Sequence, residues 1–220
     1  MPPTATLEEI KAHQDRVEKD KITPDNLPPC PRCYVESEYF KIHAYRDRYF
    51  LVIVKMLIQK VFCSLVRFRC PGCGKTFTHY PGFAIPHKHY TQQTVTGFSE
   101  RYVKSDDMTY LHAVMIDGSA PGHPQSDGTL SPSTVHRWIT TLARFTDTCR
   151  GALSVVLQEN PTSSIHRDLA RLIVPKRKYK TDHRKKQLGD CRKLLILEGI
   201  LKAVFQRSIF TKLATRFSFG

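Results

Sequence analysis

Hydrophobic and polar positions follow two different periods along the chain, and the change of period divides the sequence. Between residues 39 and 68, β-branched and aromatic residues dominate, a composition typical of strands. We expect a strand to open at residues 39–42, a polar turn at 46–48, and further strands at 50–54 and 61–68.

A helical period replaces the strand pattern after residue 86. Residues 91–104 and 108–116 predict two short helices, and a connection rich in Gly, Pro and Ser follows at 119–128. A stronger helix begins with Ser131 as N-cap and Pro132 at the first helical position. Its apolar face carries Val135, Trp138, Ile139, Leu142 and Phe145.

The same apolar stripe continues through Cys149, Ala152 and Val156 at close to a seven-residue repeat. We expect this face to pack within the monomer. A dimer seam is the alternative interpretation.

Two Cys-x-x-Cys pairs are the most specific motif: Cys30 with Cys33, and Cys70 with Cys73. Such pairs close tight turns, and two turns together supply the four thiolates that tetrahedral zinc prefers. We therefore predict a structural Zn²⁺ cofactor in a zinc ribbon with an enlarged hairpin, stabilised by about 10 kcal/mol of metal binding. Two unrelated cysteine turns or a redox pair are the alternatives.

Other potential ligands are given simpler roles. His43, His79, His87 and His89 are extra ligands in one interpretation, but with four thiolates available we expect them to face solvent or phosphate. Cys63, Cys149 and Cys191 lie in apolar surroundings and are predicted to be core thiols.

Charge indicates the kind of partner. The 220 residues carry a net charge of +14, which attracts a polyanion. No apolar leader is present near Met1, and charged residues interrupt the most apolar run, 49–68, so we expect no membrane partner and a cytoplasmic, nucleoid-associated protein.

Basic residues are concentrated after residue 166, and we expect them to contact nucleic-acid phosphates. The predicted contacts are Lys176, Arg177, Lys178, Lys180, Arg184, Lys185 and Lys186, with Arg46, Arg48, Arg67 and Arg69 as further backbone contacts. A solvated linker is the simpler alternative for this segment. The amphipathic residues 194–217 are expected to pack on the core or on a partner.

The three helices between residues 91 and 145 are typical of a helix-turn-helix, in which the third helix enters the major groove. Ser133, Thr134, His136 and Arg137 lie off its apolar stripe and are the predicted base contacts. An ordinary helical bundle with polar residues facing water is the alternative.

These motifs resemble a known family. Cys30–Cys33, His43-x-Tyr45-Arg46 and the run Arg67–Phe77 are similar to the N-terminal zinc ribbon of bacterial insertion-sequence transposases, and 130–139 resembles their helix-turn-helix. Stand-alone bacterial proteins of unknown function share this order of motifs. Tyr34 departs from the pattern, because Gly is usual after the second cysteine.

The resemblance implies DNA binding without cleavage. In the transposases the ribbon and helices bind the ends of the element, and a separate RNase H-like domain with three metal-binding acids cuts them. Only 75 residues follow Phe145 here, too few for that catalytic sheet. We expect no catalytic residues and no enzymatic activity.

The predicted architecture is α+β: a small four-Cys zinc ribbon of β-structure, then a helix-turn-helix and further helices. Its expected parts are an N-terminal arm (1–28), the zinc ribbon (29–86), the helix-turn-helix domain (87–158) and a basic helical region (159–220).

The function expected is that of a zinc-containing DNA-binding protein of a prokaryotic mobile element, defence or regulatory locus, with duplex DNA as partner. Two alternatives stay open. One is a nuclease or transposase subunit with Mg²⁺ on Asp106, Asp107 and Asp117. The other is an adaptor that docks a larger protein through the zinc ribbon and the C-terminal helix. A homodimer is a further possible assembly.

Overall fold

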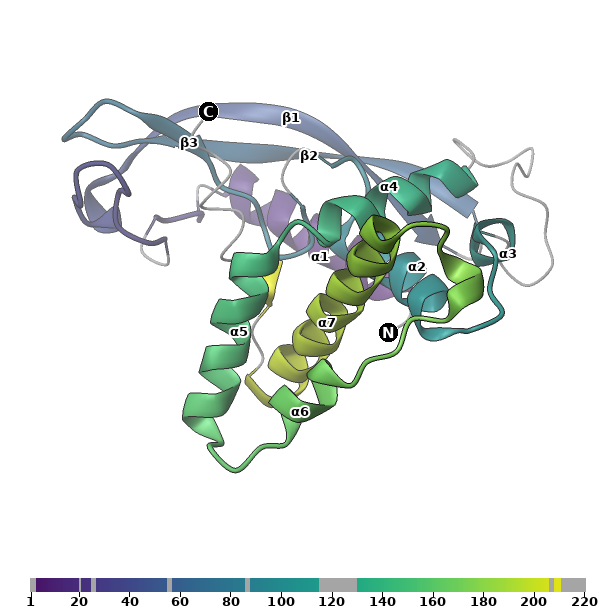
Figure 1. Ribbon diagram of the computed structural model, residues 1–220. Helices are drawn as coiled ribbons and strands as arrows, with labels where there is room; N and C mark the ends of the chain where they lie inside the picture. The colour runs from purple at the N-terminus through teal and green to yellow at the C-terminus, as the bar shows by residue number, and fades with distance from the viewer. Residues whose placement is uncertain are drawn as a thin grey trace. The chain divides into compact units, whose positions relative to one another are not determined.

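The computed structural model of the protein (Figure 1) describes residues 3–19, 21–24, 27–54, 57–85, 88–114, 130–205 and 208–210. The chain divides into two compact units. We call residues 1–94 with 210–220 the cysteine unit, and residues 95–209 the helical unit. Strands and helices occur together, so the α+β prediction is confirmed at this level.

A long hairpin forms the centre of the cysteine unit. A 3-10 turn at Ser37–Tyr39 precedes the hairpin. Strand β1 (Lys41–Val54) pairs antiparallel with β2 (Leu57–Arg69), and β2 pairs with the short β3 (Thr76–Thr78). The polar turn predicted at 46–48 is wrong, because these residues lie within β1 opposite 63–65 of β2. Three charged residues in a row suggested a turn, but the edge of a twisted hairpin accommodates them.

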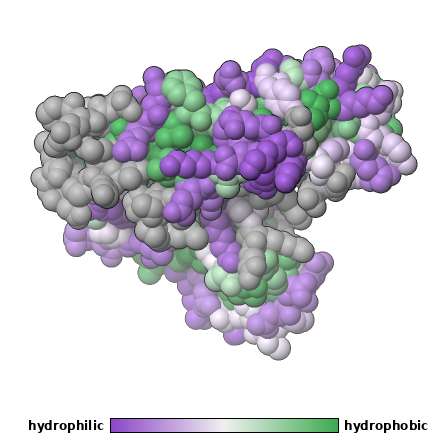
Figure 2. Space-filling model, turned by 180° about the vertical axis from the view of Figure 1, so that it is seen from behind, coloured by the Kyte–Doolittle hydropathy of each residue, from purple (hydrophilic) through white to green (hydrophobic). Residues whose placement is uncertain are grey.

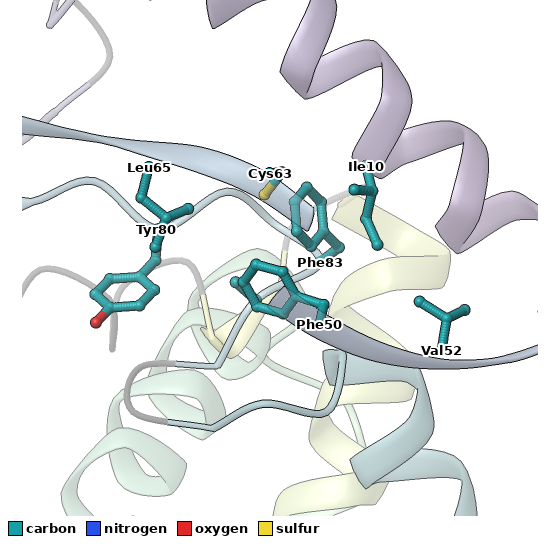
Figure 3. Close-up of a cluster of buried hydrophobic side chains, with 8 residues drawn as sticks. Ile10, Phe50, Val52, Cys63, Leu65, Tyr80 and Phe83 are labelled. Atoms are coloured by element: carbon teal, nitrogen blue, oxygen red, sulfur yellow. The ribbon is translucent and has the colours of Figure 1, made fainter. Parts of the chain in front are cut away.

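Helix α1 (Pro3–Glu18) covers β2, although the sequence pattern did not predict it. Its Ile10 joins Phe50, Val52, Cys63, Leu65 and Phe83 in a buried cluster (Figure 3). His13 and Gln14 contact the backbone of Ser64: His13 Nε2 lies 3.1 Å from the carbonyl oxygen, and the amide donates to Gln14 Oε1 at 2.9 Å. The helix thereby satisfies backbone groups at the edge of β2 that would otherwise be unpaired.

The helical unit begins within α2 (Gln92–Lys104), which confirms the first predicted helix. It continues with α3 (Tyr110–Val114), α4 (Pro132–Leu142), α5 (Thr146–Glu159), α6 (Ile165–Ala170), a 3-10 turn at Lys176–Lys178, and α7 (Asp182–Phe205). Within it, α4 packs on α3 and α7, and α5 packs on α7 (Figure 1). The connection 119–128 lies outside the described residues.

The apolar stripe predicted to run from Val135 to Val156 is divided between two helices. Helix α4 ends at Leu142 and α5 starts at Thr146, so a continuous seam is wrong. Val135, Trp138, Ile139 and Leu142 are buried, as are Ala152 and Val156.

Hydrophilic side chains cover much of the face of the molecule seen in Figure 2, and hydrophobic ones form smaller patches between them. Among the described residues, no helix has the length and apolar character needed to span a bilayer. Leu213 and Phe217 of the predicted amphipathic segment lie outside the described residues.

Candidate metal centre and nucleic-acid surface

The two cysteine pairs form turns with the same backbone geometry. In the first, Cys30 N–H donates to the carbonyl of Val35 at 2.9 Å, and Tyr34 N–H donates to that of Cys30 at 2.8 Å. In the second, Cys70 N–H donates to the carbonyl of Lys75 at 2.9 Å, and Gly74 N–H donates to the carbonyl of Cys70 at 3.0 Å. Each turn therefore directs its two sulfurs to the same side.

The residue after the second cysteine is left-handed in both turns, with φ of 58° at Tyr34 and 67° at Gly74. Glycine adopts this conformation without steric cost, whereas a residue with a Cβ atom costs about 1 kcal/mol or more there. Tyr34 thus departs from the family pattern in residue type, but it keeps the backbone path of the turn.

Gly72 is needed where the two turns approach each other. A Cβ atom at this position would lie 2.8 Å from Val35 Cγ2 and 3.2 Å from Cys33 Sγ. A larger residue would have to displace the Val35 side chain and crowd the Cys33 sulfur, one of the four cluster atoms.

The four thiols form one compact cluster whose ligand atoms all lie within 4.8 Å of one another. Across the turns, Cys30 Sγ is 3.6 Å from Cys73 Sγ, and Cys33 Sγ is 3.4 Å from Cys70 Sγ. Sulfurs at the corners of a tetrahedron around zinc are about 3.8 Å apart, given Zn–S bonds of about 2.3 Å. The cluster can therefore hold a metal ion, and its donor set and spacing fit zinc.

The protonation of the thiols depends on one another. Burial raises the pKa of Cys30, but the backbone amides of Arg32 and Cys33 and the neighbouring thiols outweigh it and bring that pKa to about 7. The amide of Val35 lowers the pKa of Cys33, but burial and the other thiols raise it to about 12. The first thiol therefore loses its proton readily, whereas the negative charge of that thiolate opposes deprotonation of the next. A bound cation removes this repulsion.

The cluster is anchored in an apolar layer of its own. Cys30 and Cys70 are buried together with Phe40, which directly precedes β1, Val66 and Phe68 of β2, and Phe77 of β3. This layer covers Cys30 and Cys70, whereas Cys33 and Cys73 are half-buried. Apolar packing around the ligands is typical of structural metal sites.

The histidines have other surroundings. His43 is exposed on β1, and His89 stacks on Tyr49 with centroids 4.3 Å apart. His79 packs edge-on to Phe68. The cluster found among the described residues consists of the four cysteines, and His87 lies outside those residues.

In the helical unit, α4 has the capping expected from its sequence. Ser131 Oγ accepts from the backbone amide of Ser133 at 3.3 Å, and Pro132 starts the helix. Ser133, His136 and Arg137 are exposed and Thr134 is half-buried, while the apolar face is turned inward. Arg137 donates to Ser133 Oγ at 3.3 Å, so these two polar groups form a pair on the surface.

Arg184 at the start of α7 joins three helices. Its guanidinium donates to Thr140 Oγ1 of α4 at 3.0 Å and to Gln187 Oε1 at 2.9 Å, and it also donates to the hydroxyl of Tyr110 on α3. Partial desolvation, with a further contribution from Arg184, lowers the pKa of the largely exposed His136. Tyr110 and Thr140 were not predicted as site residues, because a hydroxyl that orients an arginine has no distinctive sequence pattern.

Two other predicted phosphate contacts are engaged within the protein. Arg177 pairs with Asp107 at 2.6 Å and donates to the carbonyl of Asp106 at 2.8 Å. Lys178 donates to the carbonyl of Tyr102 and lies 4.1 Å from the centre of its ring. Asp107 is therefore an ion-pair partner, and Asp117 of the magnesium hypothesis lies outside the described residues.

The remaining basic residues of this segment face solvent. Lys176, Lys180, Lys185 and Lys186 are exposed, with Lys185 5.7 Å from the centre of the Tyr179 ring and Lys186 3.1 Å from Asp190. The predicted cations thus fall into two groups, one that ties parts of the helical unit together and one that is exposed at the surface.

Arginines of the hairpin divide in the same way. Arg48 is half-buried and donates to the hydroxyl of Tyr80 and to the carbonyl of Lys88, and Arg67 donates to Thr76 Oγ1. Arg46 and Arg69 are exposed.

The comparisons with known proteins relate this geometry to one family model. Residues 30–138 match a domain of unknown function, DUF6431. The match begins at the first metal-cluster cysteine and ends within α4, so it includes all four thiols and the predicted base contacts but not the basic segment. No curated protein and no solved structure matches the chain. The resemblance to transposases stays a prediction.

Proposed function

We propose that the chain is a zinc-containing, non-enzymatic protein that binds duplex DNA, encoded by a prokaryotic mobile element, defence or regulatory locus. In this proposal Zn²⁺ is held by Cys30, Cys33, Cys70 and Cys73. Helices α3 and α4 act as a helix-turn-helix, and the basic start of α7 contacts the DNA backbone.

A structural role for the metal is supported by the closed donor set. Four thiolates occupy all tetrahedral positions, which leaves none for water or substrate. The ion would fix the two turns against each other at Gly72 and secure the base of the hairpin.

The observation that carries DNA binding is the position of Arg184. Its hydrogen bond to Thr140 fixes the start of α7 beside α4, on the side of α4 that continues from the exposed His136 and Arg137. His183, Lys185 and Lys186 of α7 are also exposed. Base-contacting and phosphate-contacting groups would then share one surface, as groove binding requires.

The roles proposed for these residues follow from their chemistry. Arg137 can donate two hydrogen bonds to guanine, and Ser133 and His136 can bond base edges or phosphates. Thr134, which is half-buried, would contact the backbone near the groove. Lys176, Lys180, Lys185 and Lys186 would pair with phosphates without regard to sequence.

The test compares two arginines of the helical unit. Arg137→Ala should weaken binding to a preferred duplex by about 1 to 3 kcal/mol and relax specificity at one base pair. Arg171→Ala removes the same charge from an exposed position at the end of α6 and should leave the specific site unaffected. Affinities are measured by fluorescence anisotropy at two salt concentrations.

Equal losses for both variants on every sequence would contradict base recognition by α4. Association with a protein partner that is insensitive to salt, with no DNA binding, would favour the adaptor hypothesis instead.

A further inference from the structure

The helical unit contains a pocket of about 390 Å³, between the end of α4 and helices α5, α6 and α7. This volume is within the range of small-molecule sites. All of its lining residues belong to the helical unit, so the pocket depends only on how these helices pack. Figure 1 shows α5 and α7 side by side, with α6 beside their lower ends.

Apolar side chains form much of the pocket wall. Leu142 and Leu169 are buried, and Phe145, Cys149 and Leu153 are half-buried, which leaves part of each of the latter facing the opening. An apolar chain in this space would remove that surface from water. Each Å² of apolar surface buried favours binding by about 25 cal/mol.

Charged groups lie at the opening, and most of them already have partners. Arg150 pairs with Asp147, and Lys186 pairs with Asp190 at 3.1 Å. Lys193 also lines the pocket, and no carboxylate of the described chain is at ion-pair distance from its ammonium group.

These features select the charge of the ligand. Lys193, a cation without a carboxylate partner among the described residues, lies beside apolar side chains, and this combination fits a molecule with one negative charge and an apolar body. Asp190 also lines the pocket and would repel a doubly charged phosphate more strongly than a carboxylate. A neutral or cationic amphiphile would leave Lys193 without a partner.

We propose that this pocket binds a small monocarboxylic acid, with its apolar chain between α5, α6 and α7 and its carboxylate paired with Lys193. The pocket shares Lys186 with the proposed phosphate contacts but none of the proposed base contacts of α4, and Lys193 is not a proposed DNA contact, so the site can be tested whether or not the chain binds DNA.

The test titrates the full-length, zinc-loaded protein with octanoate, octanol, octylamine and octyl phosphate. Binding is followed by calorimetry and by the emission of Trp138, the single tryptophan, which lies one helical turn before Leu142 on the buried face of α4. We expect octanoate to bind at least tenfold more tightly than each of the other three.

Two variants identify the site. Lys193→Gln should reduce octanoate affinity to that of octanol, and Ala170→Phe, at an exposed lining position, should block binding by filling the opening. Lys104→Gln removes a lysine from α2 outside the pocket and should bind octanoate as the unaltered protein does. Circular dichroism confirms that each variant is folded.

Several results would overturn the proposal: no octanoate binding at millimolar concentration, equal binding of all four compounds, tighter binding of octyl phosphate, or an unchanged preference for octanoate in folded Lys193→Gln.

Discussion

The metal cluster and the basic surface are built in opposite ways. The cluster brings four side chains from two short turns to within 4.8 Å, and each turn closes through its own backbone hydrogen bonds. The basic surface collects cations from separate helices, and three of them, Arg177, Lys178 and Arg184, are held by groups of the protein itself. A local motif with fixed spacing thus specifies its own geometry, whereas a charge-rich segment leaves the role of each residue to tertiary packing.

Metal removal should have the largest effect, because it should destabilise the cysteine unit and leave the helical unit folded. Structural zinc binding contributes on the order of 10 kcal/mol, comparable to the whole stability of a domain. Chelation, or Cys70→Ser, should therefore unfold the cysteine unit but leave the helices of the other unit in place. A partial loss of circular dichroism would report unfolding of the cysteine unit, unchanged Trp138 emission would report that the helical unit stays folded, and Cys149→Ser is the thiol control outside the cluster.

Retention of the same thermal transition after the metal is removed would contradict a stabilising role for the ion in the cysteine unit.

Acid should weaken the cysteine unit through its buried histidines. Burial, with smaller contributions from His13 and Arg16, lowers the pKa of His79 to about 4, and burial also lowers that of His13. A pKa lowered by folding means that the unfolded state binds more protons, so stability is complete above pH 6.5 and is lost as the pH falls toward 4. For His79 the loss is at most about 3 kcal/mol.

Urea unfolding at pH 7 and pH 4.5 measures this effect, and His79→Gln should make stability depend less on pH. An identical pH dependence in that variant would show that His79 is not responsible.

Arg184 should matter for folding more than its exposed neighbour Lys185. Arg184→Ala removes hydrogen bonds to Thr140 and Tyr110 and should lower the stability of the helical unit by about 1 to 3 kcal/mol. Lys185→Ala should change stability by less than about 0.5 kcal/mol. Its effect should appear in DNA affinity, with a shallower salt dependence.

Urea titrations followed by Trp138 fluorescence measure the two stabilities. If the two variants lose equal stability, the division between structural and available cations is incorrect.

The two cysteine turns offer the finest comparison. Tyr34→Gly should stabilise the cysteine unit by about 1 kcal/mol, because the left-handed conformation at φ 58° no longer carries a Cβ penalty. Gly74→Ala should destabilise it by a similar amount, although its nearest contact, Arg69 at 3.6 Å, leaves room for a methyl group. Denaturant midpoints of the metal-loaded variants test both signs.

The features that could be predicted from the sequence are those determined locally, and the features that were missed depend on tertiary packing. Cysteine spacing located the cluster, and Ser131-Pro132 located the start of α4, because caps and turns are determined within a few residues. Helix α1 was missed although Leu7, Ile10, His13 and Val17 recur at helical spacing, since a histidine interrupts the apolar stripe. His13 occupies this position because its ring hydrogen-bonds the carbonyl of Ser64 at the edge of β2, which is a requirement of the tertiary structure.

The sequence also could not distinguish cations that hold the helices together from cations that face solvent, because tertiary packing decides between these roles. Arg184 and Lys185 are adjacent in sequence, yet one bonds Thr140 on another helix and the other faces solvent. Only the packing of α7 on α4 distinguishes them.

The most direct test of DNA recognition is a binding selection on the zinc-loaded protein with random duplex DNA, at two salt concentrations and with an RNA competitor. We expect an enriched motif that persists at the higher salt, and we expect the preference at one of its base pairs to be lost when Arg137→Ala is selected in parallel. Binding without a motif, lost steeply as salt rises and equal for the RNA competitor, would contradict this expectation.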